Sequence, residues 1–188
     1  MSFIFNYWLI AMKNIEVELR SFVDEEKYRQ LINFFDQKAK FLKEDNQITH
    51  YFTWGHDLRI QKNNFFSKIW MKKWALHDDH REEIEIKFDK EDFDKLQQLF
   101  INLWYEIEIT WIRKCLQFDR DGIEVSLDYT KGYGYVIELE ILSTDLDKDE
   151  NLEILRQKFA ELEITITPKE EFKTKYEWYK TNWKTLIE

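Results

Sequence analysis

Charged side chains occupy every second position in several short segments of the sequence. In the first segment the charged positions are Glu16, Glu18 and Arg20, separated by single apolar residues. Because successive side chains point to opposite faces of a β-strand, these three would share one face. Later segments repeat the alternation at Asp57 and Arg59; at Arg81, Glu83, Glu85 and Lys87; at Glu124, Ser126 and Asp128; and at Glu138 and Glu140. Carboxylates suit hard divalent cations and guanidinium groups suit phosphate oxygens, so such a face could bind a metal ion and a phosphorylated molecule.

Two arrangements of the strands explain this alternation. For any one strand, the simpler arrangement is a sheet with one face packed against helices and the charged face in water. The recurrence of acids and bases on nearly every strand favours the other arrangement, in which about eight strands close into a barrel around a small ligand. Helices would then cover an apolar outside, and the inside would be polar.

Hydrophobic periodicity predicts the elements that position these faces. Alternating apolar residues predict strands at 15–22, 40–53, 57–62, 66–74, 80–88, 105–118, 122–130 and 133–142. Helical spacing predicts helices at 24–38, 90–103, 147–162 and 169–187. The short connections, above all Asp121-Gly122, indicate hairpins and therefore antiparallel pairing. The predicted fold is α+β: an eight-stranded antiparallel β-barrel with helices packed outside.

Composition limits the class of protein. The 188 residues include 44% apolar and 17% aromatic residues, enough for an ordered core in a single domain over 13–188. Residues 1–12 are either an N-terminal extension or an apolar flap packed on that domain. The formal net charge of −9 argues against a broad nucleic-acid-binding surface, and the apolar run at 3–10 is too short to span a bilayer and lacks signal-peptide features. Because Cys115 is the only cysteine, an internal disulfide is excluded, and we expect a cytoplasmic protein.

Several further motifs carry less information. No P-loop and no Gly-x-Gly-x-x-Gly turn is present, so those nucleotide sites are excluded at motif level. His77-Asp78-Asp79-His80 is more typical of a solvated loop than of a metal site. Most tryptophans have core spacing, but Trp70 and Trp111 share strand faces with Lys72 and Arg113 and could contact a ligand.

The order of the motifs indicates a family. Glu16-Val17-Glu18-Leu19-Arg20 has the form Glu-x-Glu-x-base. It is followed by Tyr51-Phe52, Leu58-Arg59-Ile60-Gln61, Trp70-Met71-Lys72, Arg81-Glu82-Glu83-Ile84-Glu85, Leu127-Asp128, Gly132-Tyr133-Gly134 and Glu138-Leu139-Glu140. In this succession the chain resembles the CYTH-type triphosphate tunnel family from residue 13 to about 142. The helices predicted at 147–187 would be the closing element of that family.

This resemblance implies a charged tunnel, open at both ends, that holds a triphosphate and Mg²⁺ or Mn²⁺. The implied phosphate-binding bases are Arg20, Arg59, Lys72, Arg81 and Arg113, with Lys68 and Lys87 as reserves. The implied metal ligands are Glu16, Glu18, Asp128, Glu138 and Glu140, which requires the first and last strands to be neighbours. The implied catalytic residues are Glu18, Lys72 and Glu140, with Glu18 or Glu140 orienting the attacking water. Glu83 and Glu85 are expected to pair with tunnel bases.

Three residues depart from the family pattern. Arg20 replaces the signature lysine, Gln61 stands where a second base is usual, and Cys115 takes the place of a base two positions after Arg113. A phosphate contact near Cys115 is therefore in doubt. Near Gln61, we expect the contacts with the substrate to differ from those in other members of the family. Lys114, between Arg113 and Cys115, should point outward.

The resemblance leaves three functions open. The first is metal-dependent hydrolysis of inorganic triphosphate, a nucleoside triphosphate or thiamine triphosphate. The second is class IV adenylate cyclase activity, which makes cyclic AMP and pyrophosphate from ATP. The third is a non-catalytic module that binds polyphosphate or a nucleotide. In each case the partner is a phosphorylated small molecule, without nucleic acid or membrane, and the protein is expected to be a monomer or homodimer.

Overall fold

The computed structural model describes residues 15–53, 57–72 and 83–188. At Lys72 and Glu83 it describes the backbone only. The strands are β1 (Ile15–Val23), β2 (Lys40–Phe52), β3 (Asp57–Lys62), β4 (Ser67–Lys72), β5 (Glu83–Phe88), β6 (Ile107–Arg120), β7 (Ile123–Thr130) and β8 (Gly134–Ser143). The helices are α1 (Glu25–Lys38), the short 3-10 helix η1 (Lys90–Asp92), α2 (Phe93–Asn102), α3 (Lys148–Glu161) and α4 (Lys169–Leu186). These bounds confirm the predicted α+β fold.

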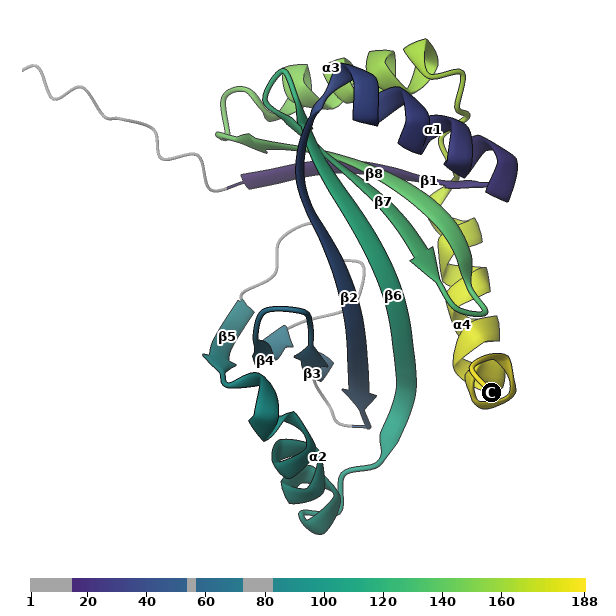
Figure 1. The fold of residues 1–188 in the computed structure, drawn as a ribbon. Coiled ribbons are helices and arrows are strands. Elements are labelled where there is room, and N and C mark those ends of the chain that lie inside the picture. The colour runs from purple at the N-terminus through teal and green to yellow at the C-terminus, as the bar shows by residue number, and fades with distance from the viewer. Residues whose placement is uncertain (1–14, 54–56, 73–82) are drawn as a thin grey trace, which may run out of the picture.

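All eight strands belong to one antiparallel sheet in the order β1-β8-β7-β6-β2-β3-β4-β5. Figure 1 shows that β2 and β6 are long and strongly curved, and that the sheet curls around one face. β1 and β5 end the order, and within the described residues no pairing joins them. The predicted neighbourhood of the first and last strands is confirmed, because β1 pairs with β8 along its whole length.

The main core lies on the outer, convex face of the sheet. Its apolar strand positions include Val17, Leu127 and Leu139, and α1 and α3 cover them with Phe35 and Phe159. In Figure 1 both helices lie together over one end of the sheet. Burying this apolar stripe is what fixes each strand face, since a shift of one residue would turn the charged positions into the core.

A second, smaller core lies under α2. Phe93 of this helix packs on Phe52, Leu58 and Ile60 from β2 and β3. In Figure 1, α2 lies at the opposite end of the sheet from α1. The two helical layers therefore cover separate parts of the convex face.

Local signals explain where several elements begin and turn. Asp24 caps α1, because its Oδ1 accepts a hydrogen bond from the Lys27 backbone N–H at 2.7 Å. Asp121 and Gly122 both have positive φ, 58° and 81°, as the hairpin predicted between β6 and β7 requires. No helix among the described residues is long and apolar enough to cross a membrane.

Hydrogen bonds from two aromatic side chains join the last helix, α4, to β6 and to the turn after β7. The Tyr179 hydroxyl donates to the carbonyls of Thr110 at 3.0 Å and Lys131 at 3.2 Å. Trp183 Nε1 donates to the carbonyl of Glu108 at 2.8 Å. These contacts hold α4 against β6 and the turn that follows β7.

Candidate active site

The inner, concave face of the sheet carries the charged residues. Val17, Leu127 and Leu139 are in the main core, so the residues at alternate positions on β1, β7 and β8 point the other way. The predicted acids and bases on that face are Glu16, Glu18, Arg20, Arg59, Arg113, Asp128, Glu138 and Glu140. Arg81 lies outside the described residues, as do residues 77–80. Lys72 is in β4 opposite Asp57, but its side chain is not described.

Three glutamates converge where β1 meets β8. Carboxylate oxygens of Glu18, Glu138 and Glu140 lie within 4.8 Å of one another. The strand register explains this, because Glu18 is directly opposite Glu140 and Arg20 is opposite Glu138. On the other side of β8, Glu124 of β7 is also opposite Glu140. The predicted metal ligands from distant parts of the sequence are thus brought together.

The crowding of these acids shifts their proton affinities. Burial, together with the charges of Glu18 and Asp128, raises the pKa of Glu138 to about 8. Burial, with Glu16 and Glu124 nearby, raises the pKa of Glu140 to about 7. The raised pKa values reflect the cost of placing several negative charges close together. A hard divalent cation such as Mg²⁺ or Mn²⁺ would offset that cost by binding to the carboxylate oxygens.

The other two predicted ligands stand apart from this group of three. Glu16 is exposed and lies opposite Leu142, two pairs away from the Glu18–Glu140 pair. Asp128 uses one oxygen to bind Arg113 at 2.9 Å. Its second oxygen, Oδ1, is buried and has no hydrogen-bond partner among the described residues. An acceptor left in this state is a further place where a cation or donor would be stabilised.

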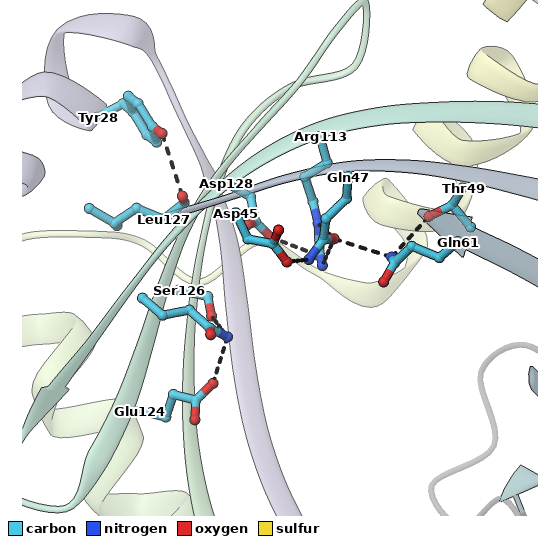
Figure 2. Close-up of polar contacts among 11 residues, drawn as sticks. Tyr28, Asp45, Gln47, Thr49, Gln61, Arg113, Glu124, Ser126, Leu127 and Asp128 are labelled. Atoms are coloured by element: carbon cyan, nitrogen blue, oxygen red, sulfur yellow. Dashed lines mark hydrogen bonds and ion pairs between the residues drawn. The ribbon is translucent and has the colours of Figure 1, made fainter. Parts of the chain in front are cut away.

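A network of buried polar side chains fixes Arg113 at the centre of the inner face (Figure 2). The guanidinium donates to Gln47 Oε1 from Nη2 at 2.6 Å and from Nε at 2.9 Å, and from Nη1 to Asp128. Gln47 in turn donates to Asp45 at 2.8 Å, and Gln61 donates to Thr49 at 3.0 Å and to Gln47 at 3.3 Å. Although burial opposes the charge, the neighbouring Asp128 carboxylate raises the pKa of Arg113 above its ordinary value.

The remaining bases lie toward β3, β4 and β5. Arg59 forms a two-point ion pair with Asp57 and stacks over Tyr51, with 4.3 Å from its Cζ to the ring centroid. It is also 5.5 Å from the ring of Trp70, which is 6% exposed. Further along, Lys68 binds Glu85 at 2.7 Å, so the expected structural pairing of Glu85 is confirmed.

Arg20 and Lys175 are cations without a carboxylate at ion-pair distance among the described residues. Arg20 Cζ lies 5.0 Å from the ring of Phe172 in α4. Lys175 Nζ, from the next turn of that helix, lies 4.0 Å from the ring of Phe22 and 5.3 Å from that of Tyr133. Burial lowers the pKa of Lys175, as expected for an amine that lacks a strong counter-charge.

Aromatic packing covers the end of the inner face next to α4. Trp111, which shares a face with Arg113, lies 4.9 Å from Tyr179 and 4.5 Å from Tyr133 between ring centroids. Tyr176 of α4 approaches it at 6.5 Å. The resemblance implied a tunnel open at both ends, whereas here α4 lies against one end.

Some residues of this face were not singled out from the sequence. Asp45, Gln47 and Thr49 alternate along β2 and are between 1% and 8% exposed. Their spacing within the predicted strand 40–53 could have revealed them. Lys175 could not be found that way, because its helix reaches the site only through the tertiary fold. The outward orientation expected of Lys114 is confirmed by its ion pair with exposed Glu44 at 2.8 Å.

Comparisons with known proteins support the family that the sequence motifs indicated. The protein named "Putative adenylate cyclase MJ0240" of Methanocaldococcus jannaschii is 31% identical over 164 residues, covering 80% of this chain and 91% of that protein. The PH1012 protein of Pyrococcus horikoshii OT3 has a TM-score of 0.67 at 19% identity, covering 82% of this chain and 96% of its own. No protein-family model matches the chain.

A second similar structure comes from Hippeastrum. The plant protein described as "Putative adenylyl cyclase HpAC1 from Hippeastrum" has a TM-score of 0.59 at 16% identity, covering 79% of this chain and 87% of its own, and its description reports a dominant triphosphatase activity. At this identity the likeness establishes the shared fold alone. With the Methanocaldococcus relative, the β1–β8 pairing and the charged inner face, the chain belongs to the CYTH-type triphosphate tunnel family.

Proposed function

We propose that the protein is a divalent-metal-dependent hydrolase that acts on a triphosphate-containing small molecule bound to the inner face. The observation that carries this proposal is the convergence of Glu18, Glu138 and Glu140 at one end of a face that presents Arg113 and Arg59 further along. An enzyme that processes triphosphates needs cations at both ends of the anion. The family supports the triphosphate, and the dominant triphosphatase activity described for the Hippeastrum protein supports hydrolysis.

The acidic end would hold the metal ion. Glu18, Glu138 and Glu140 supply oxygen ligands, and Asp128 Oδ1 lies on the neighbouring strand. When bound, Mg²⁺ or Mn²⁺ supplies positive charge that offsets the charge developing on the transferred phosphoryl group. Because the pKa values of Glu138 and Glu140 are raised to about 8 and about 7, ligation near neutral pH must release protons.

The basic residues would bind and orient the phosphate chain. Arg113 is held by Gln47 and Asp128 with part of its side chain still exposed, 34% by relative area. Arg20 and Lys175 add two cations near α4 that have no carboxylate at ion-pair distance in the described chain. A water in line with the terminal phosphate would pass its proton to a carboxylate of the cluster, Glu18 or Glu140.

Cyclisation of ATP is the second candidate, and one observation favours it. The Methanocaldococcus relative at 31% identity is named as an adenylate cyclase. Both reactions would use the same face and the same metal ligands. They differ in the attacking group, which is water in hydrolysis and the ribose 3′-hydroxyl in cyclisation.

One experiment separates the candidates. Purified protein is incubated with Mg²⁺ or Mn²⁺ and, in parallel, with inorganic triphosphate, ATP and thiamine triphosphate, while phosphate, pyrophosphate and cyclic AMP are all measured. We expect phosphate release, and a Glu18→Gln variant should lower it about 100-fold. Glu153→Gln, on the exposed surface of α3, is the matched control and should keep full activity.

Three other results of this experiment would contradict parts of the proposal. Cyclic AMP and pyrophosphate in equal amounts would establish the cyclase instead. Tight binding of all three compounds without any product would refute both enzymatic candidates and leave the non-catalytic module. Full metal-dependent activity in Glu18→Gln would contradict the assignment of the metal ligands.

A further inference from the structure

The two helical layers leave a strip of the convex face uncovered between them. Strand register places Lys62, Ile48 and Ile112 side by side on β3, β2 and β6. Ile112 also accepts a backbone hydrogen bond from Lys131, just after β7. These positions have the same parity as the core residues under α1 and α2, so they face outward, away from the proposed active site.

A groove of about 510 Å³ runs along this strip. The next row of its wall consists of Asn46, Lys114 and Tyr129, which are also in register on three adjacent strands. The loop before β4 and the start of η1 close another side with Asn63, Asn64 and Lys90. Volumes of roughly 300–1,000 Å³ are typical of small-molecule sites, so the groove is large enough for a nucleotide.

The charge of the groove contrasts with that of the whole protein. Its described lining includes five basic residues, Lys62, Lys90, Lys114, Lys131 and Arg113, and no Asp or Glu. Of these residues, Lys114 forms an ion pair with Glu44, which is not part of the lining, at 2.8 Å. In a chain of formal net charge −9, a pocket lined by lysines concentrates positive potential where an anion can enter.

Three of the four lysines contact neutral groups that an anion could replace, whereas Lys114 is paired with Glu44. Lys90 Nζ donates to the Asn64 carbonyl at 3.2 Å, and Lys131 Nζ donates to the Ile187 carbonyl at 2.5 Å. Lys62 Nζ lies 5.8 Å from the ring of Phe93. A phosphate group offers several acceptor oxygens with full negative charge, which makes stronger hydrogen bonds than a neutral carbonyl.

The floor of the groove is apolar and includes an aromatic ring. Ile48 is 39% exposed and Tyr129 is 37% exposed, while Ile112 is half-buried between them. The Tyr129 ring is held in place by Tyr135 at 4.8 Å between centroids. A flat heterocycle would gain contact area on this floor while its phosphates reach the lysines.

We propose that this outer groove is a second ligand site that binds a nucleoside polyphosphate, with the base on Ile48, Ile112 and Tyr129 and the phosphates on Lys62 and Lys114. An acidic protein segment would complement the lysines but would leave the flat apolar floor without a matching ring. Gln47 and Arg113 also contribute to the groove lining, but the side chains that carry this proposal have the outward parity of their strands. The proposal does not depend on the proposed hydrolysis.

The test is an ATP titration of the full chain with methyl-labelled isoleucine, followed by NMR in excess chelator. The chelator keeps ATP intact, because it withholds the cation that the proposed hydrolysis requires. We expect saturable shifts of the Ile48 and Ile112 methyl signals and none for Ile137, which is fully buried in the main core. Inorganic triphosphate, which lacks the ring, should bind about tenfold more weakly than ATP.

Matched variants locate the site. Lys62→Gln combined with Lys114→Gln should weaken ATP binding about tenfold, because two charge contacts are removed. Lys38→Gln combined with Lys173→Gln removes the same charge from exposed helical positions and should leave the Kd unchanged. Tyr129→Ala should weaken the binding of ATP but not that of inorganic triphosphate.

Three results would overturn the proposal. They are an absence of Ile48 and Ile112 shifts at millimolar ATP, equal Kd values for the two lysine pairs, and equal affinity for triphosphate and ATP. Binding of a poly-glutamate peptide in preference to ATP would identify a protein-docking surface instead. If the methyl shifts persist while no metal-dependent turnover is found, only the proposed catalytic function is refuted.

Discussion

Replacing Glu138 by glutamine is expected to stabilise the metal-free protein and at the same time to abolish its metal binding. In the wild type this half-buried carboxyl lies near Glu18 and Asp128, and burial and their charges outweigh the opposing charges of Arg20 and Arg113. Glutamine has nearly the same shape but no charge to desolvate. The variant therefore removes a source of repulsion that the native protein retains.

The magnitude follows from the shift in pKa. Glu138 has a pKa of about 8 in the folded protein, against an ordinary value of 4.5. Because the folded pKa is raised, the stability that its bound proton provides is complete below about pH 4.5 and is lost as pH rises toward 8. Relative to acidic pH, the wild type loses up to about 3 kcal/mol by pH 7 and less than about 1 kcal/mol by pH 5. Glu138→Gln has no such dependence at this position.

The assay is urea denaturation with chelator at pH 5 and pH 7. We expect the gap in unfolding free energy between Glu138→Gln and the wild type to be larger at pH 7, by about 2 kcal/mol. Addition of Mn²⁺ should then stabilise the wild type and have little effect on the variant, since ligand binding to the folded state alone raises stability. Glu153→Gln, an exposed position on α3, should stay within about 0.5 kcal/mol of wild type at both pH values.

Two results would refute this reasoning. A variant that is less stable than wild type at both pH values would show that Glu138 makes favourable contacts as an anion. A gap that is equal at pH 5 and pH 7 would show that its pKa is close to that of an ordinary glutamate. In either case the picture of a crowded carboxylate cluster would have to be abandoned.

Three further predictions concern individual side chains. Arg113→Lys keeps a positive charge but cannot reach both Gln47 and Asp128, so the KM for the triphosphate substrate should rise about tenfold in steady-state assays, and an unchanged KM would argue against Arg113 as a phosphate ligand. Tyr179→Phe removes the buried hydroxyl that anchors α4, so urea denaturation should show a loss of about 1–2 kcal/mol. Burial raises the pKa of the Cys115 thiol, so a thiol reagent at pH 8 should label it only after denaturation; rapid labelling of the native protein would contradict its burial.

The strand faces could be predicted because alternation is a local property. Burial of Val17 beneath the helices obliges Glu16 and Glu18 to face the other way, and the same argument holds along β7 and β8. The helix predicted at 90–103 begins instead as the short η1, followed by α2 from Phe93. Such differences at element ends reflect competition between turn and helix bonding that periodicity does not detect.

The network around Arg113 could not be predicted, because it depends on how strands pair. Gln47 and Arg113 are 66 residues apart and meet through the register of β2 with β6. In the sequence, the neighbouring Gln61 is notable only because the family usually has a basic residue at that position. In the structure its amide donates hydrogen bonds to Thr49 and Gln47. Likewise, Lys175 reaches the inner face only because α4, at the C-terminal end of the chain, packs against Phe22 of β1.

The fixed position of Arg113 has a consequence for the entropy of binding. A long arginine side chain in water samples many rotamers, and ordering it on a ligand costs about 2 kcal/mol. Here Gln47 and Asp128 have already selected one rotamer when the protein folded. The neutral amide of Gln61 contributes by holding Gln47, not by touching the ligand. Replacing the family's base by Gln61 removes one positive charge from the inner face. Binding an anion at Arg113, however, costs little additional side-chain entropy, because the arginine is already ordered before the ligand arrives.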